Sequence, residues 1–151
     1  LFAGCGRLGA ILADMNPDQE EKLNEYGHAL GMAFQLTDDL LDYTSSEDTL
    51  GKPVLKDLVE GRTTLPIIHL MQRASSKEEK FIRDVVEKQD FDPQNKQRII
   101  DLVQACGALE ESQTRAEEYV RQAKNALSAF PDSIYRDALL SLAELVMDRE
   151  K

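Results

Sequence analysis

The segment GMAFQLTDDLLDY, residues 31–43, carries three aspartates inside an otherwise apolar stretch with helical periodicity. Asp38, Asp39 and Asp42 would share one patch of a helix, because residues three or four positions apart are neighbours there. Gln35 would extend the patch by one turn. Like charges at this spacing destabilise a helix by roughly 0.2–0.5 kcal/mol per pair. A bound divalent cation would reverse the sign of that contribution.

The chemistry of the patch favours magnesium. Mg²⁺ prefers carboxylate oxygens, keeps several waters and usually shares its coordination shell with substrate phosphates. No His or Cys accompanies the aspartates, so zinc is the poorer match. The alternative is a solvated acidic face on an acid-rich chain, and DDxxD by itself does not separate the two interpretations. Gly27 and Gly31, on the same side of the helix, leave space for another helix or for a ligand.

Basic residues follow the aspartates in the stretch LGKPVLKDLVEGRTTLP. A loop that returns along the C-terminal end of the aspartate helix would place Lys52, Lys56 and Arg62 opposite the carboxylates. Carboxylate-bound Mg²⁺ together with Lys and Arg is suited to binding a diphosphate. Each basic residue taken alone is more simply an ordinary surface charge.

Composition limits the class of protein. The chain has 151 residues and is 42% hydrophobic, enough for one globular domain with a core. Its formal net charge of −10 argues against nucleic acid and anionic membranes as partners. The two cysteines form no disulfide framework, and no stretch is long and apolar enough to span a bilayer. We therefore expect a cytoplasmic protein without stable membrane insertion.

Nearly all of the chain has helical patterning. Asn16, Pro17 and Gln19 form a helix start signal, and the helix should continue to about Tyr43. Its predicted core positions are Leu23, Tyr26, Leu30, Ala33, Thr37 and Leu40. An apolar helical stripe also precedes this helix, at Leu1, Leu8, Ile11, Leu12 and Met15.

The remaining signals predict further helices and no strand. Residues 44–64 have little periodicity, and Pro66 should open the next helix. A capping box at Ser75 or Ser76 and an Asp92-Pro93 start should begin two more, the second ending at Gly107. Helices over about 109–129 and 134–149 complete an all-α fold of packed antiparallel helices.

Three stretches closely resemble the trans-isoprenyl diphosphate synthases: FQLTDDLLDY, LGKPVLKDLVEGRTTLPIIHLM and GALEESQTRAEEYVRQAKNAL. The nearest type is the long-chain, octaprenyl-like bacterial enzyme. The resemblance covers the whole chain and corresponds to the C-terminal half of the family's length. It implies an isoprenoid-synthase helix bundle whose upstream half is absent, including a first aspartate-rich motif and a Lys-Thr pair. The chain also begins within an apolar helical pattern, so we expect a fragment that is inactive by itself.

The resemblance also implies roles for the acidic residues. Asp38, Asp39 and Asp42 match the family's second aspartate-rich motif, which holds Mg²⁺ on the allylic diphosphate, partly through water. All three are predicted to bind metal. Asp38 and Asp39, together with Lys52, are predicted to be catalytic.

Substrate contacts follow by the same resemblance. Phe34 and Gln35 match an FQ pair beside the allylic substrate, and Lys52 matches a lysine that contacts its diphosphate. Arg62 stands where a lysine with the same task is usual, so it keeps the charge with a different geometry. Leu55 stands where glycine is common, which predicts a departure in the path of the loop.

The function implied is condensation of isopentenyl diphosphate onto an allylic diphosphate, giving a long-chain polyprenyl diphosphate of the kind used for quinone side chains. We also expect a homodimer. One alternative is a shorter-chain synthase that makes farnesyl or geranylgeranyl diphosphate. Another, from a different class, is a non-catalytic helical subunit of such an enzyme. The GK and EGxxTLP segments fit elongating enzymes better than terpene cyclases.

Overall fold

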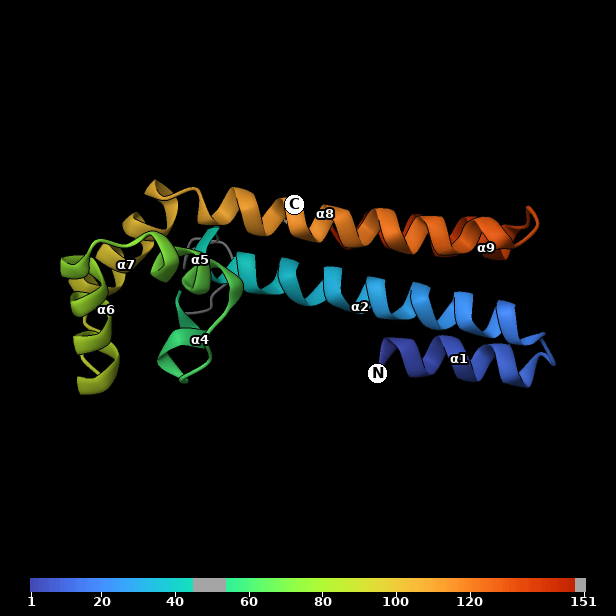
Figure 1. Cartoon of the computed structure of the whole chain (residues 1–151), viewed down its shortest axis with the longest axis horizontal. Coiled ribbons are helices and arrows are strands. Elements are labelled where there is room, and N and C mark those ends of the chain that lie inside the picture. Colours follow the sequence, from blue (N-terminus) through green and yellow to red (C-terminus); the bar gives the residue numbers. More distant parts are fainter. Residues whose placement is uncertain (45–53, 149–151) are drawn as a thin grey trace. The chain divides into compact units, whose positions relative to one another are not determined.

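The computed structural model describes residues 1–44 and 54–148, and Figure 1 shows the chain. Its contacts divide into two compact units. Unit 1 comprises Leu1–Thr37 and the chain from Thr114 onward, and unit 2 comprises Asp38–Gln113. Every regular element within the described residues is a helix, which confirms the all-α prediction.

Unit 1 is built from long helices that alternate in direction (Figure 1). It contains α1 (Phe2–Leu12), most of α2 (Pro17–Thr44), most of α8 (Ala108–Ala126), a 3₁₀ turn (Leu127–Ala129) and α9 (Ile134–Leu145). Its core unites side chains of α2, α8 and α9, among them Tyr26, Leu30, Ala33, Val120, Ala123 and Ala143. The Tyr26 hydroxyl donates a hydrogen bond to the Leu139 carbonyl at 2.9 Å, which ties α2 to α9.

The predicted start of α2 is confirmed. The Asn16 Oδ1 accepts the Gln19 N–H at 2.9 Å, and the Gln19 Oε1 accepts the Asn16 N–H at 3.4 Å. The predicted core positions of this helix are buried, except for Leu23, which is only partly buried. A strong local signal and a regular apolar period therefore suffice to define this element.

Glycines allow α1 to lie directly against α2. A Cβ added to Gly27 would lie 2.3 Å from the Phe2 carbonyl oxygen, and one added to Gly6 would lie 2.2 Å from the Leu23 carbonyl oxygen. No side chain fits at either distance, so the backbones approach each other through reciprocal glycines. Of the two occupants considered for the space beside Gly27, the structure shows another helix.

The apolar stripe of α1 is mostly exposed. Leu8, Ile11 and Leu12 are exposed by 55%, 52% and 77%, and only Ala10 is buried in this helix. Phe2, Gly6 and Ala10 thus lie on the packed side of α1, while Leu8, Ile11 and Leu12 leave much of their surface in water.

Unit 2 contains the end of α2 and the start of α8. Between them, the described residues 54–107 form α4 (Lys56–Val59), α5 (Leu65–Arg73), α6 (Ser76–Lys88) and α7 (Pro93–Ala105). α5 packs against α7. The core includes Leu55, Leu58, Ile67, Leu70, Ile82, Val85, Ile99 and Val103. These helices therefore surround a hydrophobic core of their own.

Several helix boundaries in unit 2 follow their predicted signals. Ser75 and Glu78 form a reciprocal capping box, and the Asp92 carboxylate accepts the Asn95 N–H at 2.7 Å. Gly107 follows α7 with a φ of +72°. The stretch 44–64, which has little periodicity in sequence, contains the four-residue helix α4. At the other end of the chain, α9 ends at Leu145 rather than near residue 149.

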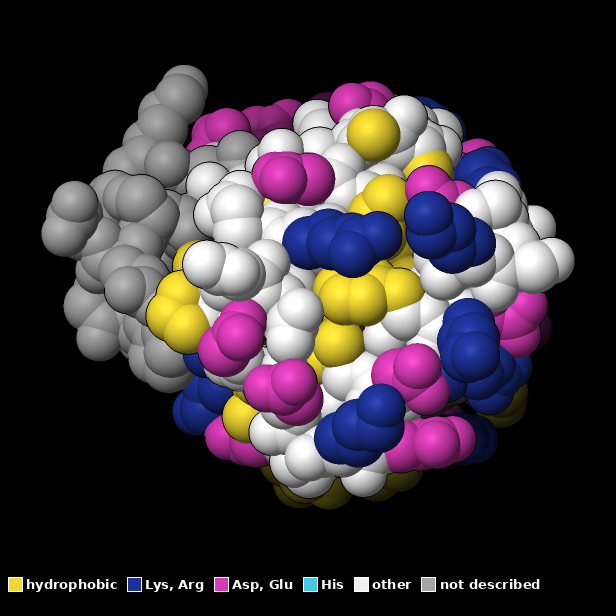
Figure 2. Space-filling model, turned by 90° about the vertical axis from the view of Figure 1, so that its left-hand side faces the viewer, with side chains coloured by type: hydrophobic (Ala, Val, Ile, Leu, Met, Phe, Trp, Pro, Cys, Tyr) yellow, Lys and Arg dark blue, Asp and Glu magenta, His cyan; other side chains and the backbone are white. Residues whose placement is uncertain are grey.

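The face of the molecule in Figure 2 mixes both signs of charge. Lys and Arg side chains alternate there with Asp and Glu, and hydrophobic side chains lie among them. In unit 2, the Arg98 guanidinium lies 4.1 Å above the Phe81 ring. Although acidic residues outnumber basic ones in the sequence, this face is therefore not uniformly acidic. Of the helices described, none is long and apolar enough to cross a membrane.

Candidate metal and diphosphate site

The three aspartates at the end of α2 occupy three different environments. Asp38 is exposed, Asp39 is buried with 8% of its surface exposed, and Asp42 is partly buried. No three His, Cys, Asp or Glu side chains in residues 1–44 and 54–148 are grouped closely enough to hold a metal ion. The metal-binding roles of the aspartates therefore stay predictions.

Asp42 holds the start of α4. Its Oδ1 accepts the backbone N–H of Lys56 at 3.0 Å, and its Oδ2 accepts the N–H of Asp57 at 3.0 Å. The Asp42 carbonyl also accepts the N–H of Leu55 at 3.2 Å. One residue thus receives three consecutive amides, and the predicted return of the loop along the end of the aspartate helix is observed here.

The conformation of Leu55 makes this return possible. Its φ of 56° and ψ of 29° lie in the left-handed region, which costs an ordinary side chain roughly 1–2 kcal/mol. Its side chain is nevertheless completely buried. Burying a leucine contributes about 1.5–3 kcal/mol, enough to offset the strain. A glycine at this position would adopt the same turn without that strain.

Burial raises the pKa of the Asp42 carboxyl above its ordinary value, because the charged form loses solvation. The backbone N–H groups of Asp57 and Lys56 act in the opposite direction. The negative charge of Asp57 adds to the upward shift, and the positive charge of Arg62 reduces it. The carboxylate is therefore held in a place where an additional cation would be stabilising.

The basic residues near this site pair within their own segment. The Arg62 guanidinium binds the Asp57 carboxylate at 2.6 Å and the Glu60 carboxylate at 2.6 Å. The Lys56 Nζ lies 3.7 Å from Glu60. Hydrogen bonding to Asp57 raises the pKa of Arg62. The pairs with Glu60 are exposed, and exposed pairs contribute only about 0–1 kcal/mol, so a diphosphate could displace Glu60. The Asp57 side chain is only 19% exposed, so its pair with Arg62 is better shielded from water.

Phe34 and Gln35, both predicted to lie beside the allylic substrate, have different surroundings in the structure. Phe34 packs into the core of unit 1, with its ring centroid 5.5 Å from that of Phe2. Gln35 is exposed on the next position of α2. Lys52 lies outside the described residues. The roles of all three toward substrate remain predictions.

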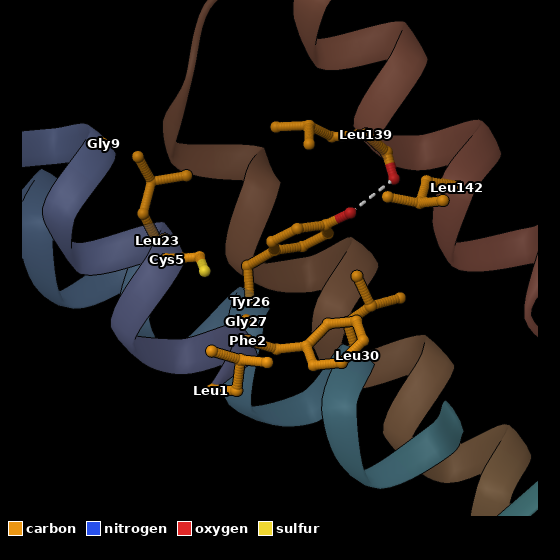
Figure 3. Close-up of a pocket in the computed structure, with 11 residues that line it drawn as sticks. Leu1, Phe2, Cys5, Gly9, Leu23, Tyr26, Gly27, Leu30, Leu139 and Leu142 are labelled. Atoms are coloured by element: carbon orange, nitrogen blue, oxygen red, sulfur yellow. Dashed lines mark hydrogen bonds between the residues drawn. The ribbon is translucent and has the colours of Figure 1, made fainter. Parts of the chain in front are cut away.

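Unit 1 also contains an apolar pocket of about 450 Å³ between α1, α2 and α9, shown in Figure 3. Phe2, Leu30 and Leu142 line it with other apolar side chains, and the hydroxyl of Tyr26 points to the Leu139 carbonyl. Among the described residues that line the pocket, none has a charged side chain. It is therefore suited to apolar groups and not to a diphosphate.

The sequence did not indicate Asp57, which joins Asp42 to Arg62, or the pairing of Tyr43 with Thr64. The hydroxyls of Tyr43 and Thr64 lie 2.9 Å apart in the interior of unit 2. Nothing in the residues next to Asp57 or Thr64 in sequence indicates these contacts. Asp57 contacts Asp42, and Thr64 contacts Tyr43, so each partner is distant in sequence.

Known proteins provide an independent comparison. The family described as "Polyprenyl synthetase" matches residues 1–103. The chain is 39% identical to octaprenyl diphosphate synthase of Escherichia coli, over 100% of this chain and 46% of that protein. It is 35% identical to a short chain isoprenyl diphosphate synthase of Methanothermobacter thermautotrophicus, over 99% of this chain and 46% of that protein.

A solved structure extends the comparison to the fold. A polyprenyl synthase of Caulobacter crescentus, complexed with calcium and isoprenyl diphosphate, superposes with a TM-score of 0.89 and 35% identity. The match covers 99% of this chain and 46% of that one. The chain thus spans about half the length of the relatives that it matches. These matches establish that the chain belongs to the polyprenyl synthetase family.

Proposed function

We propose that the chain supplies the C-terminal half of an Mg²⁺-dependent prenyltransferase, which condenses isopentenyl diphosphate onto an allylic diphosphate. The observation that supports this most directly is the arrangement at the end of α2. The exposed carboxylate of Asp38 stands one turn before Asp42, which holds the basic segment that follows. This arrangement lies within the residues that match the family.

In the proposed site, Asp38 and Asp39 hold Mg²⁺, and Asp42 contributes through water. Lys52 and Arg62 bind oxygens of the allylic diphosphate, with Phe34 and Gln35 beside the substrate. When bound, Mg²⁺ would neutralise negative charge that develops on the leaving diphosphate. Calcium in the structure of the Caulobacter crescentus relative is consistent with a divalent cation in this family.

The reaction divides into bond breaking and bond formation. The allylic carbon–oxygen bond breaks, and its electron pair leaves with the diphosphate. The double bond of isopentenyl diphosphate then attacks the allylic cation, and loss of a proton forms the new double bond. Arg62 and Lys52 would stabilise the diphosphate that departs, and apolar helices would exclude water that could trap the cation.

A long-chain product, a homodimer and a cytoplasmic location form part of this proposal. The similarity to an octaprenyl diphosphate synthase supports the long-chain product. The similarity to a short chain synthase keeps a farnesyl or geranylgeranyl product as the alternative. Against a non-catalytic subunit, the intact aspartate motif retains a repulsion between carboxylates that a bound cation would relieve.

The test is a complete synthase made by joining residues 1–151 to the N-terminal half of the Escherichia coli relative. With farnesyl diphosphate, labelled isopentenyl diphosphate and Mg²⁺, it should add several isopentenyl units, measured by chromatography of the dephosphorylated products. A single farnesyl or geranylgeranyl peak would refute the long-chain product. Residues 1–151 alone should incorporate no label.

A matched pair of variants tests the metal site. Asp38→Asn should lower turnover about 100-fold or more, because it removes charge stabilisation at the leaving group. Asp101→Asn removes the same charge from an exposed position on α7 and should leave turnover unchanged. Equal turnover in the Asp38→Asn variant and the parent would exclude the proposed role of Asp38.

A further inference from the structure

Two consecutive residues of α2 hold the two ends of residues 55–64, the segment that leads into α5. Asp42 receives the backbone amides of Leu55, Lys56 and Asp57, and Tyr43 pairs with Thr64 at the start of α5. We propose that Asp42 is a positioning residue, whose carboxylate fixes this segment and thereby sets the place of Arg62. This proposal rests on the proposed function for its catalytic consequence, but not for the contact itself.

The bonding capacity of the carboxylate supports this role. Each oxygen accepts one backbone N–H, at 3.0 Å in both cases. Bonds from amides to a charged carboxylate are stronger than those between neutral groups. Each oxygen keeps lone-pair capacity for a water molecule, so holding the segment does not prevent an outer contact with hydrated metal.

Asp57 connects Asp42 to Arg62, because it forms hydrogen bonds with both residues. Asp57 donates its backbone N–H to Asp42, and its own carboxylate binds the Arg62 guanidinium through Nε at 3.1 Å and Nη2 at 2.6 Å. The backbone carbonyl of Asp57 also accepts the N–H of Arg62 at 2.8 Å. Asp57 is therefore fixed on one side by Asp42 and fixes Arg62 on the other.

Asp38 differs from Asp42 in every one of these respects. Its side chain is exposed and forms no hydrogen bond or ion pair with another residue that the structure describes. The two carboxylates stand one helical turn apart on α2, so the same substitution at each makes a matched comparison. We assign metal binding to Asp38 and segment positioning to Asp42.

The first experiment needs no activity. Hydrogen exchange is measured on residues 1–151 without metal, for the parent, Asp42→Asn and Asp38→Asn. An asparagine offers only one acceptor oxygen, so Asp42→Asn should accelerate exchange in the peptide spanning residues 54–62 about tenfold. Asp38→Asn should leave that peptide unchanged. Equal exchange in the parent and Asp42→Asn would overturn the proposal, whatever the enzyme does.

The second experiment separates positioning from metal binding in the complete synthase described above. Asp42→Asn should raise the KM for the allylic diphosphate about tenfold and shift the half-saturating Mg²⁺ concentration by less than twofold. Asp38→Asn should chiefly shift the Mg²⁺ requirement. If both variants raise the half-saturating Mg²⁺ concentration to the same extent, Asp42 acts as a metal ligand and the positioning role is wrong.

Asp57→Asn provides a second variant that keeps the backbone contact to Asp42. It weakens the pair with Arg62 and should reproduce the rise in the KM for the allylic diphosphate without accelerating exchange at residues 54–57. An unchanged KM would show that Arg62 is not placed through Asp57. If the parent synthase is inactive, the proposed function fails, and the exchange result still decides whether Asp42 positions the segment.

Discussion

The hydroxyl groups of Tyr43 and Thr64 lie 2.9 Å apart in the interior of unit 2. Tyr43 is 3% exposed and Thr64 is 7% exposed, so neither hydroxyl has ready access to water. Burial raises the pKa of Tyr43 well above its ordinary value, which keeps the phenol protonated at neutral pH. This bond secures the start of α5 against the end of the aspartate helix.

Removing both partners of that bond should destabilise the fold by less than the sum of the two single removals. Tyr43→Phe leaves a buried threonine hydroxyl without its partner and should lower the free energy of unfolding by about 1–3 kcal/mol. Thr64→Val should act similarly, while the double variant should lose less than the sum of the two. Urea unfolding measures all three, and Tyr135→Phe at an exposed site serves as the control. Additive losses would contradict a direct Tyr43–Thr64 contribution.

Leu55 should show an unusual order of stability between alanine and glycine. Leu55→Ala loses the buried side chain and keeps the left-handed strain, at a loss of about 2–5 kcal/mol. Leu55→Gly loses the same contacts but relieves the strain, so it should be more stable than the alanine variant by about 1 kcal/mol. Urea unfolding compares the two variants.

Leu70 supplies the matched comparison for Leu55. It is also buried, but it lies within α5, where glycine is less favourable than alanine by about 0.8–1.0 kcal/mol. Leu70→Gly should therefore be less stable than Leu70→Ala. The same order at both positions would mean that the positive φ of Leu55 does not contribute to stability.

Arg62 should act through charge at the allylic diphosphate. In the complete synthase, Arg62→Ala should raise the KM for the allylic substrate about 10- to 100-fold, as expected for loss of a charge-assisted hydrogen bond. Arg62→Lys should recover part of that loss, since it keeps the charge but loses the planar fork. Arg83→Ala removes an arginine that is similarly exposed and paired with Glu79, and should leave KM unchanged. Steady-state kinetics would disprove the role if Arg62→Ala and Arg83→Ala behaved alike.

The exposed apolar side chains of α1 should promote self-association of residues 1–151. Leu8 and Leu12 lie on this helix and leave much of their surface in water, which favours contact between copies. Replacing both by Gln should shift the protein toward monomer in size-exclusion chromatography with light scattering. Tyr135→Ser, which removes an equally exposed side chain from α9, should change the distribution little. A monomeric parent chain would show that this surface does not drive association.

Much of the fold could be predicted because its signals are local. Asn16 with Gln19, Ser75 with Glu78, and Asp92 with Asn95 satisfy amides within the first turn of a helix, so neighbouring residues determine where these helices begin. The apolar period of α2 likewise identified Tyr26, Leu30 and Ala33 as core positions. The types and spacing of Asp38, Asp39 and Asp42 were sufficient to indicate a candidate site for a cation.

Only the tertiary structure decided how those aspartates differ. Helical spacing makes Asp38, Asp39 and Asp42 neighbours, but their exposure depends on what packs against each side of α2. The turn at Leu55 and the helix α4 have no strong local preference, and their amides are satisfied by Asp42, more than ten positions earlier. Such contacts form only after the chain has folded back on itself. The sequence alone therefore determined the residue types and helix starts, whereas folding determined which carboxylate faces solvent and which holds the segment.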